Sequence, residues 1–177
     1  MNFDQSYRDK LMNASDAAAM VRDGDTVIVP TGVGEPPALL TALSARGPAL
    51  SGVTVSQILP LRKYDYFNPE TIGNIRHSAY FFGGPSRPGG QAGWIDFLPA
   101  YFSELPMLID RGLTPADVVF SMASPMDEHG YFALSLAPDY TMAAIRRARA
   151  VVLEVNPNVP SAFGDCRVHI SQVSALV

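Results

Sequence analysis

The sequence comprises 177 residues, of which 47% are hydrophobic and 17% are charged. This much apolar material supports one domain with its own core and excludes a disordered chain. Thirteen basic and seventeen acidic residues give a net charge of −4, so the chain lacks the basic surface that attracts nucleic acids and anionic membranes.

Signals for export or membrane insertion are also missing from the sequence. No apolar run approaches the ~18 residues that a membrane-spanning helix needs, and the aspartate-rich segment 1–25 lacks the apolar core of a signal peptide. The single cysteine, Cys166, has no partner for a disulfide within the chain. These features predict a cytoplasmic protein.

Short apolar segments alternate with helical ones along the chain. The predicted strands, in chain order, are 26–30, 53–59, 76–82, 117–124 and 150–155, with a short alternating strand after residue 130. The predicted helices are 16–22, with Ser15 as its N-cap, then 38–46, 101–111 and 139–149. Segment 82–93 holds five glycines and two prolines and is predicted to be a loop. This alternation predicts an α/β fold, a mainly parallel open sheet flanked by helices, as a single domain over 1–177.

Several nucleotide and metal motifs are incomplete. Gly32 and Gly34 follow a predicted strand, but Pro37 stands where a dinucleotide-binding turn needs its third glycine. The Walker loop and the nucleophile elbow are both absent from the sequence. Cys166 and His169 have a ligand-like spacing without further partners, so no metal site is predicted.

The strand, glycine-rich turn and helix of segment 27–43 form the first candidate site. Backbone N–H groups at such a turn, together with the positive end of the helix dipole, can bind a carboxylate, a phosphate or a developing oxyanion. A tight turn that merely needs two glycines explains the same pattern, and spacing alone does not separate these interpretations.

Two further polar turns follow predicted strands. In the turn Asp127–Gly130, the carboxylates and His129 are candidates for acid–base groups, although Asp and Gly are also ordinary turn residues. Segment 154–160, which contains Asn156, leaves its strand in the same way.

Four segments of the chain resemble the acetyl-CoA hydrolase/transferase family, which includes 4-hydroxybutyrate and acetate CoA-transferases. They are 32–40, 95–106, 117–135 and 150–160. Family enzymes consist of two similar α/β halves with the active site between them, and this chain resembles the N-terminal half. The resemblance implies that the C-terminal half is absent and that the chain is a fragment or a separate subunit.

The resemblance also implies a division of roles. The nucleophilic glutamate belongs to the missing half, so no catalytic residue is expected here, and Glu35, Glu128 and Glu154 are not expected to be nucleophiles. Two sets of residues are expected to contribute to the site. The acyl- or oxyanion-binding set is Gly32, Val33, Gly34, Glu35 and Pro36, and the cleft-edge set is Asp127, Glu128, His129, Gly130 and Asn156.

The expected activity is transfer of coenzyme A between an acyl-CoA and a small carboxylate, or hydrolysis of acetyl-CoA. Coenzyme A thioester is then a substrate, with no permanently bound cofactor. The expected partners are the C-terminal half and further copies of the chain. The alternatives are a non-catalytic module that binds a sugar phosphate or an acyl-CoA through the glycine-rich turn, and a pure interaction module.

Overall fold

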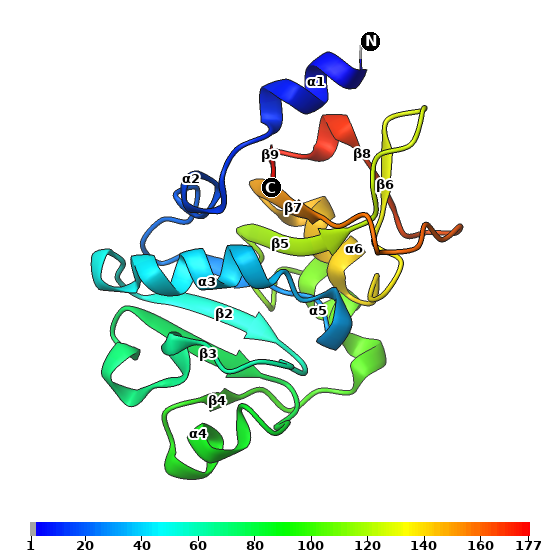
Figure 1. Ribbon diagram of the computed structural model, residues 1–177. Coiled ribbons are helices and arrows are strands. Elements are labelled where there is room, and N and C mark those ends of the chain that lie inside the picture. The colour runs from blue at the N-terminus through cyan, green and yellow to red at the C-terminus, as the bar shows by residue number, and fades with distance from the viewer. Residues whose placement is uncertain (1–2) are drawn as a thin grey trace.

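Seven parallel strands form one sheet in the computed structural model, which describes residues 3–177. The strand order is β4-β3-β2-β1-β5-β7-β9. The bounds are β1 Thr26–Ile28, β2 Val53–Gln57, β3 Ile75–Ala79, β4 Asp96–Phe97, β5 Val118–Ala123, β7 Ala150–Val155 and β9 Ala175–Leu176. Strands β6 (Tyr131–Ala133) and β8 (Arg167–His169) pair antiparallel as a separate ribbon. The expected α/β fold with a mainly parallel open sheet is confirmed (Figure 1).

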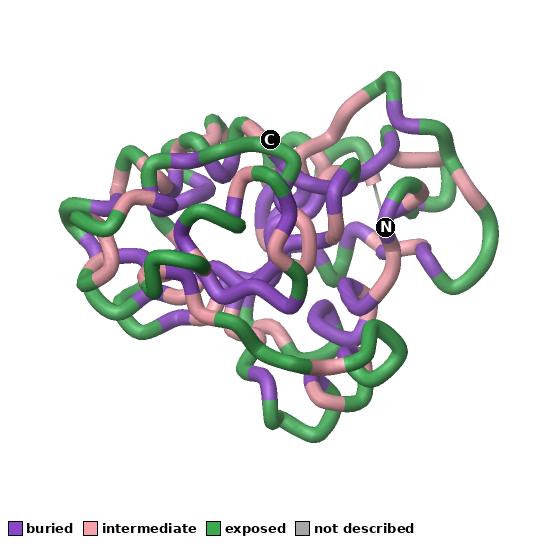
Figure 2. The backbone as a smooth tube through the Cα atoms, turned by 90° about the horizontal axis from the view of Figure 1, so that it is seen from below, coloured by how far each residue is buried: buried purple, intermediate pink, exposed green. Residues whose placement is uncertain are grey.

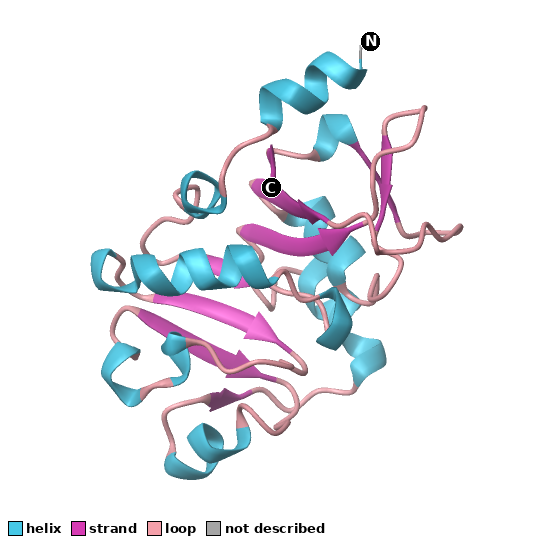
Figure 3. Ribbon diagram, in the orientation of Figure 1, coloured by secondary structure: helices cyan, strands magenta, loops and turns pink. Residues whose placement is uncertain are grey.

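Helices cover both faces of this sheet (Figures 1 and 3). The helices α2 (Ala14–Ala18) and α3 (Pro37–Arg46) pack on one face, and α5 (Leu105–Asp110) and α6 (Thr141–Arg147) pack on the other. Helix α1 (Phe3–Lys10) lies beside β9, and α4 (Arg87–Ala92) precedes β4. The short 3₁₀ helices are η1 Gly32–Gly34, η2 Gly47–Ala49, η3 Asp65–Phe67, η4 Pro69–Thr71, η5 Phe102–Glu104 and η6 Ile170–Gln172.

The strands are apolar on both faces because each face is covered by helices. Val27 of β1 faces the α3 side, whereas its neighbour Ile28 faces the α6 side. The same alternation continues along β5, where Val118 and Val119 belong to opposite layers. Figure 2 shows buried residues concentrated in the interior and exposed residues in the peripheral loops.

The order of the strands reverses at β1. From β1 the chain continues to β2, β3 and β4 on one side, and β5, β7 and β9 fill the other side. Open α/β sheets bind ligands at the carboxyl ends of the strands where the order reverses. The turn η1 follows β1 directly, so the fold puts the glycine-rich turn at this position.

Most predicted elements form, but some boundaries were wrong. Helix α2 begins two residues before the expected segment, because Asn13 rather than Ser15 is its N-cap and accepts the Asp16 N–H at 2.9 Å. The predicted helix 101–111 is divided into η5 and α5, with Pro106 in the first turn of α5. The strands β1, β2 and β3 all end two or three residues earlier than predicted.

The prediction that segment 82–93 is a loop was wrong, because the segment contains helix α4. Its glycines serve packing rather than flexibility. A Cβ on Gly89 would lie 2.5 Å from the Ile95 side chain, and one on Gly90 would lie 2.4 Å from the Phe82 ring. Gly93, with φ +85°, ends the helix in the left-handed conformation that suits glycine.

Candidate functional site

The turn η1 keeps most of its backbone donors for itself. The Gly32 N–H donates to the Leu59 carbonyl at 2.9 Å, and the N–H groups of Gly34 and Glu35 donate within the turn. Between Thr31 and Leu39, within the described chain, Val33 alone has an N–H for which no acceptor is found. The expected donors were the glycine N–H groups, and the structure leaves Val33 as the one donor open to a ligand.

The two glycines of η1 are required for different reasons. Gly32 adopts φ +50°, which most side chains avoid, while the space around its Cβ position is open. Gly34 has no such φ, but a Cβ there would lie 2.8 Å from Ala137 Cβ and 3.0 Å from Pro30 Cβ. Close packing at Gly34 therefore brings the turn against the loop that precedes α6.

Glu35 points into the protein rather than toward a substrate. Only 5% of its surface is exposed. One carboxylate oxygen accepts the Leu61 N–H at 3.1 Å and the Gln57 side-chain N–H at 3.0 Å, and the other accepts the Tyr64 hydroxyl at 2.7 Å. Burial and this hydrogen bond raise the pKa of Tyr64. Glu35 thus ties η1 to the loop that follows β2.

The N-terminus of α3 is already occupied. Pro36 is the N-cap residue and has no side-chain cap, and Glu154 at the end of β7 supplies one instead. A Glu154 carboxylate oxygen accepts the Ala38 N–H at 2.9 Å and the Leu39 N–H at 3.1 Å. Burial raises the pKa of Glu154. The positive end of this helix therefore faces a carboxylate of the protein itself. The sequence analysis expected this end of the helix dipole to help bind a ligand, whereas in the structure Glu154 occupies it.

Asp139 and Tyr140 were missed by sequence reasoning and hold the other side of the turn. The Asp139 carboxylate accepts the Thr31 N–H at 3.0 Å, and its backbone has φ +21°. The Tyr140 hydroxyl donates to the Val29 carbonyl and accepts the Ile58 N–H at 3.2 Å, so it joins the ends of β1 and β2. Burial raises the pKa of both groups. The sequence signal was weak, because an Asp before a helix usually indicates only a cap.

The turn Asp127–Gly130 lies apart from η1. Asp127 accepts the N–H groups of His129 and Tyr131 and pairs with Arg167, and Gly130 has φ +80° and lies against Phe3. The turn projects at the upper right of Figure 1 near α1, well away from the start of α3, which η1 precedes.

Two side chains of this turn, those of Glu128 and His129, are exposed. The Glu128 and His129 side chains are 86% and 73% exposed, with 3.6 Å between Glu128 Oε1 and His129 Nε2. Within the described residues, the expected common cleft edge with η1 is not formed, because pairing of β6 with β8 carries this turn away from the sheet.

Asn156 closes the turn after β7. Its side-chain oxygen accepts the Asn158 N–H at 2.9 Å, and its own N–H donates to the Ala123 carbonyl at 2.9 Å. These contacts give Asn156 a local structural role within the described residues.

An open depression of about 450 Å³ lies beside η1. Its walls come from the segments after β1 and β2 and from the chain before α6. The lining residues are Thr31, Gly32, Val33, Leu59, Leu61, Phe102, Leu136, Ala137, Pro138 and Asp139. The set is almost entirely apolar, which is typical of the part of a site that receives a hydrocarbon group.

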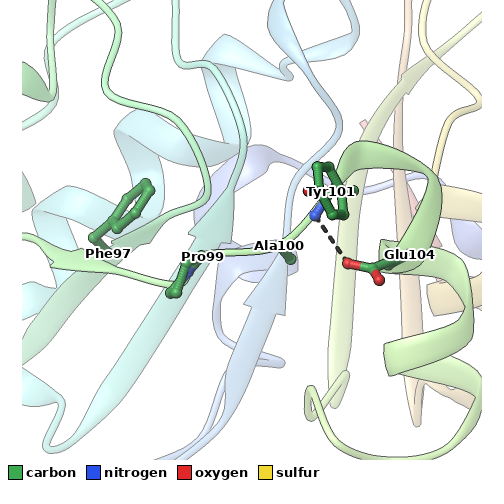
Figure 4. Close-up of a pocket in the computed structure, with 5 residues that line it drawn as sticks. All are labelled: Phe97, Pro99, Ala100, Tyr101 and Glu104. Atoms are coloured by element: carbon green, nitrogen blue, oxygen red, sulfur yellow. Dashed lines mark hydrogen bonds between the residues drawn. The ribbon is translucent and has the colours of Figure 1, made fainter.

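This depression continues along the carboxyl edge of the sheet. Phe102 is shared with a hollow beside Tyr80 and Phe81, and Ala100 is shared with a third hollow of about 400 Å³. In Figure 4 the rings of Phe97 and Tyr101 border this third hollow, and Glu104 accepts the Tyr101 N–H at 3.0 Å. Tyr101 is 78% exposed, so the described residues leave an apolar edge uncovered.

Comparison with known proteins identifies the family. The family model of the acetyl-CoA hydrolase/transferase N-terminal domain matches residues 1–177. The chain belongs to the acetyl-CoA hydrolase/transferase family. The expected membership of this family is thereby confirmed.

Curated members of the acetyl-CoA hydrolase/transferase family are more than twice as long as this chain. A succinyl-CoA:cyclohexane-1-carboxylate CoA transferase from Geobacter metallireducens is 43% identical over 176 residues, 99% of this chain and 40% of the relative. A 4-hydroxybutyrate coenzyme A transferase from Clostridium kluyveri is 30% identical over 100% of this chain and 41% of its own length. The chain thus spans about two-fifths of these relatives.

A solved structure supports the same conclusion about the acetyl-CoA hydrolase/transferase fold. The crystal structure of RipA from Yersinia pestis superposes with a TM-score of 0.91 at 27% identity, over 99% of this chain and 43% of RipA. The sugar-phosphate alternative is not favoured, because Glu154 occupies the N–H groups of α3 that would bind a phosphate.

Proposed function

We propose that this chain is the N-terminal domain of an acyl-CoA:carboxylate CoA-transferase or acetyl-CoA hydrolase, and that η1 binds the acyl oxygen. The observation that carries the proposal is the single unpaired donor of the turn, the Val33 N–H, next to an apolar depression at the carboxyl end of β1. The names of the two curated relatives support a CoA-transferase.

In the proposed reaction a glutamate of the other half attacks the acyl-CoA carbonyl carbon. The tetrahedral intermediate carries its negative charge on the acyl oxygen, which the Val33 N–H would stabilise. Loss of the CoA thiolate leaves a mixed anhydride, and attack by that thiolate on the glutamyl carbonyl releases the carboxylate and forms a glutamyl-CoA thioester. An incoming carboxylate reverses these steps, whereas water gives hydrolysis.

The glutamates of the described chain are not proposed as nucleophiles. Glu35 and Glu154 both accept hydrogen bonds from buried or backbone donors, and Glu128 lies on the remote turn. For the turn Asp127–Gly130, we propose only that it forms part of a surface that the other half of the enzyme contacts.

The remaining parts of the proposal concern partners and location. Coenzyme A thioester is a substrate and no cofactor is held permanently. The partners are an acyl-CoA, a small carboxylate, the other half of the enzyme and further copies of it. The single cysteine favours the cytoplasm. No helix among residues 3–177 is long and apolar enough to cross a membrane.

The test uses the enzyme that contains this domain together with its other half. The enzyme is incubated with acetyl-CoA and a carboxylate acceptor and then reduced with borohydride, and peptides are analysed by mass spectrometry. The expected result is CoA transfer with a reduced glutamyl adduct outside residues 1–177. An adduct on Glu35, Glu128 or Glu154, or no turnover with any acyl-CoA, would contradict the proposal.

A further inference from the structure

The hydrogen-bond ladder between β1 and β2 stops before the two chains have diverged. The last regular bond runs from the Val29 N–H to the Ser56 carbonyl at 3.1 Å, in the register of these parallel strands. Ladder bonds in a parallel pair follow at even spacing, so the Ile58 N–H would next donate to the Val29 carbonyl, and the Thr31 N–H would then donate to the Ile58 carbonyl. Among residues 3–177 neither bond forms.

The side chains of two adjacent residues take the place of both bonds. The Tyr140 hydroxyl lies between the two backbone groups, where it donates to the Val29 carbonyl and accepts the Ile58 N–H at 3.2 Å. The Asp139 carboxylate accepts the Thr31 N–H at 3.0 Å. Because an oxygen atom separates the Ile58 N–H from the Val29 carbonyl, the ends of β1 and β2 stand farther apart than a direct hydrogen bond would hold them.

This wedge, Asp139–Tyr140, is held firmly by its own surroundings. Tyr140 is 1% exposed, and its ring packs against the rings of Tyr80 and Phe102, each with 6.4 Å between ring centroids. The second Asp139 oxygen accepts the N–H of Thr141 at 3.0 Å and its hydroxyl at 2.8 Å. Asp139 also has φ +21°, and a positive φ outside glycine persists only where surrounding contacts enforce it.

The separation of the strand ends determines where the open donor of η1 lies. On the β1 side, Asp139 holds the N–H of Thr31, the residue before η1. On the β2 side, the Gly32 N–H donates to the Leu59 carbonyl at 2.9 Å. The Val33 N–H is the next donor along the chain, so a change in the distance between these two anchors would move it.

We propose that Asp139 and Tyr140 are positioning residues, which hold the ends of β1 and β2 apart so that the Val33 N–H faces the acyl oxygen. This inference rests on the proposed function and adds residues that act through the turn rather than on the substrate. Burial raises the pKa of the Tyr140 hydroxyl, so the hydroxyl keeps its proton and both of its hydrogen bonds at neutral pH. A displacement of about 1 Å in a catalytic group can cost about 100-fold in rate.

The kinetic test uses the enzyme that contains both halves, with acetyl-CoA and a carboxylate acceptor. Tyr140→Phe removes one oxygen atom and is expected to lower kcat about 10-fold or more, while KM changes less than about 3-fold. Asp139→Ala should lower kcat in the same way, and Asp139→Asn should restore part of it, because an amide oxygen can still accept the Thr31 N–H. The matched control is Tyr66→Phe. Tyr66 is also buried, but its hydroxyl has no hydrogen-bond partner within the described chain, so kcat should stay unchanged.

A crystal structure of the Tyr140→Phe enzyme tests the wedge directly. Without the hydroxyl, the Ile58 N–H is expected to bond the Val29 carbonyl at about 2.9 Å, and η1 is expected to shift with the closing strand ends. This measurement needs no turnover, so it tests the wedge independently of the proposed function.

Three outcomes would overturn the inference. The first is an unchanged kcat in a folded Tyr140→Phe enzyme. The second is a loss of kcat with η1 in its wild-type position, since the hydroxyl would then act on the reacting groups themselves. The third is an equal loss of kcat with Tyr66→Phe, which would indicate a general effect on the core. Absence of turnover by the wild type with any acyl-CoA would instead overturn the proposed function, and the crystal structure would still decide whether the wedge holds the strands apart.

Discussion

Glu35 shows how one buried side chain can control a turn that it does not itself form. Its carboxylate has three uncharged donors, from Gln57, Leu61 and Tyr64, and 5% of its surface is exposed. Removing it would leave these donors unpaired in the interior, which costs about 1–3 kcal/mol for each buried group. It would also release η1 from the loop after β2.

We therefore expect Glu35→Ala to lower kcat at least about 10-fold in the complete enzyme, with a smaller change in KM, because Val33 loses its fixed position. Glu35→Gln keeps the shape and most hydrogen bonds and should restore most of kcat. The exposed Glu70→Ala is the control. Steady-state kinetics measure both constants, and an unchanged kcat in a folded Glu35→Ala enzyme would contradict a positioning role.

At the scale of elements, Glu154 joins two elements that are distant in sequence. It is the next-to-last residue of β7 and accepts the N–H groups of Ala38 and Leu39, 116 and 115 residues away. A carboxylate at a helix N-terminus satisfies donors that the helix leaves unpaired and opposes its dipole. The contact fixes the start of α3, and with it the end of η1, against the end of β7.

Glu154→Ala is expected to lower the free energy of unfolding by about 1 kcal/mol, the usual value of a lost helix cap. Glu154→Gln should lose less, since an amide oxygen still accepts. Urea denaturation provides the measurement. Glu128→Ala is the control because its side chain is 86% exposed and outside the site, and it should change stability by less than about 0.5 kcal/mol. A loss with Glu128→Ala as large as with Glu154→Ala would refute the cap.

The sequence predicted the elements better than the contacts between them. Runs of β-branched residues identified the central strands, because strands covered on both faces must be apolar throughout. Segment 82–93 was misread because glycine favours loops in general, whereas Gly89 and Gly90 allow close packing here. The turn η1 was located correctly, but the backbone on its two sides is bonded by Asp139 and Glu154. No local sequence pattern links residues more than 100 positions apart.

At the scale of the whole molecule, the uncovered carboxyl edge is the main feature. Exposed side chains of Phe81, Phe97, Tyr101 and Phe102 lie along it. The chain corresponds to about two-fifths of the two curated relatives, and an uncovered apolar edge of this kind is typical of a binding surface.

The isolated 177-residue chain is expected to show no CoA transfer and no hydrolysis of acetyl-CoA, because the proposed reaction takes its nucleophilic glutamate from the other half of the enzyme. It should also self-associate through the uncovered edge. Sedimentation velocity over a range of concentrations tests association, and a thiol-release assay tests hydrolysis. Turnover by a strictly monomeric chain would contradict both expectations.

The joint between β1 and β5 has a consequence for how the molecule folds. Only two register pairs connect these strands, Val27 with Val118 and Ile28 with Val119, whereas six connect β5 with β7. Thr26 and Asp117, which bond at this joint, are 91 positions apart, so its formation requires closure of a long loop. We expect each side of the sheet to assemble first from its neighbours in sequence, and the joint to close last. Because η1 lies at the end of β1, the local opening that separates the two folding units would also displace the Val33 donor.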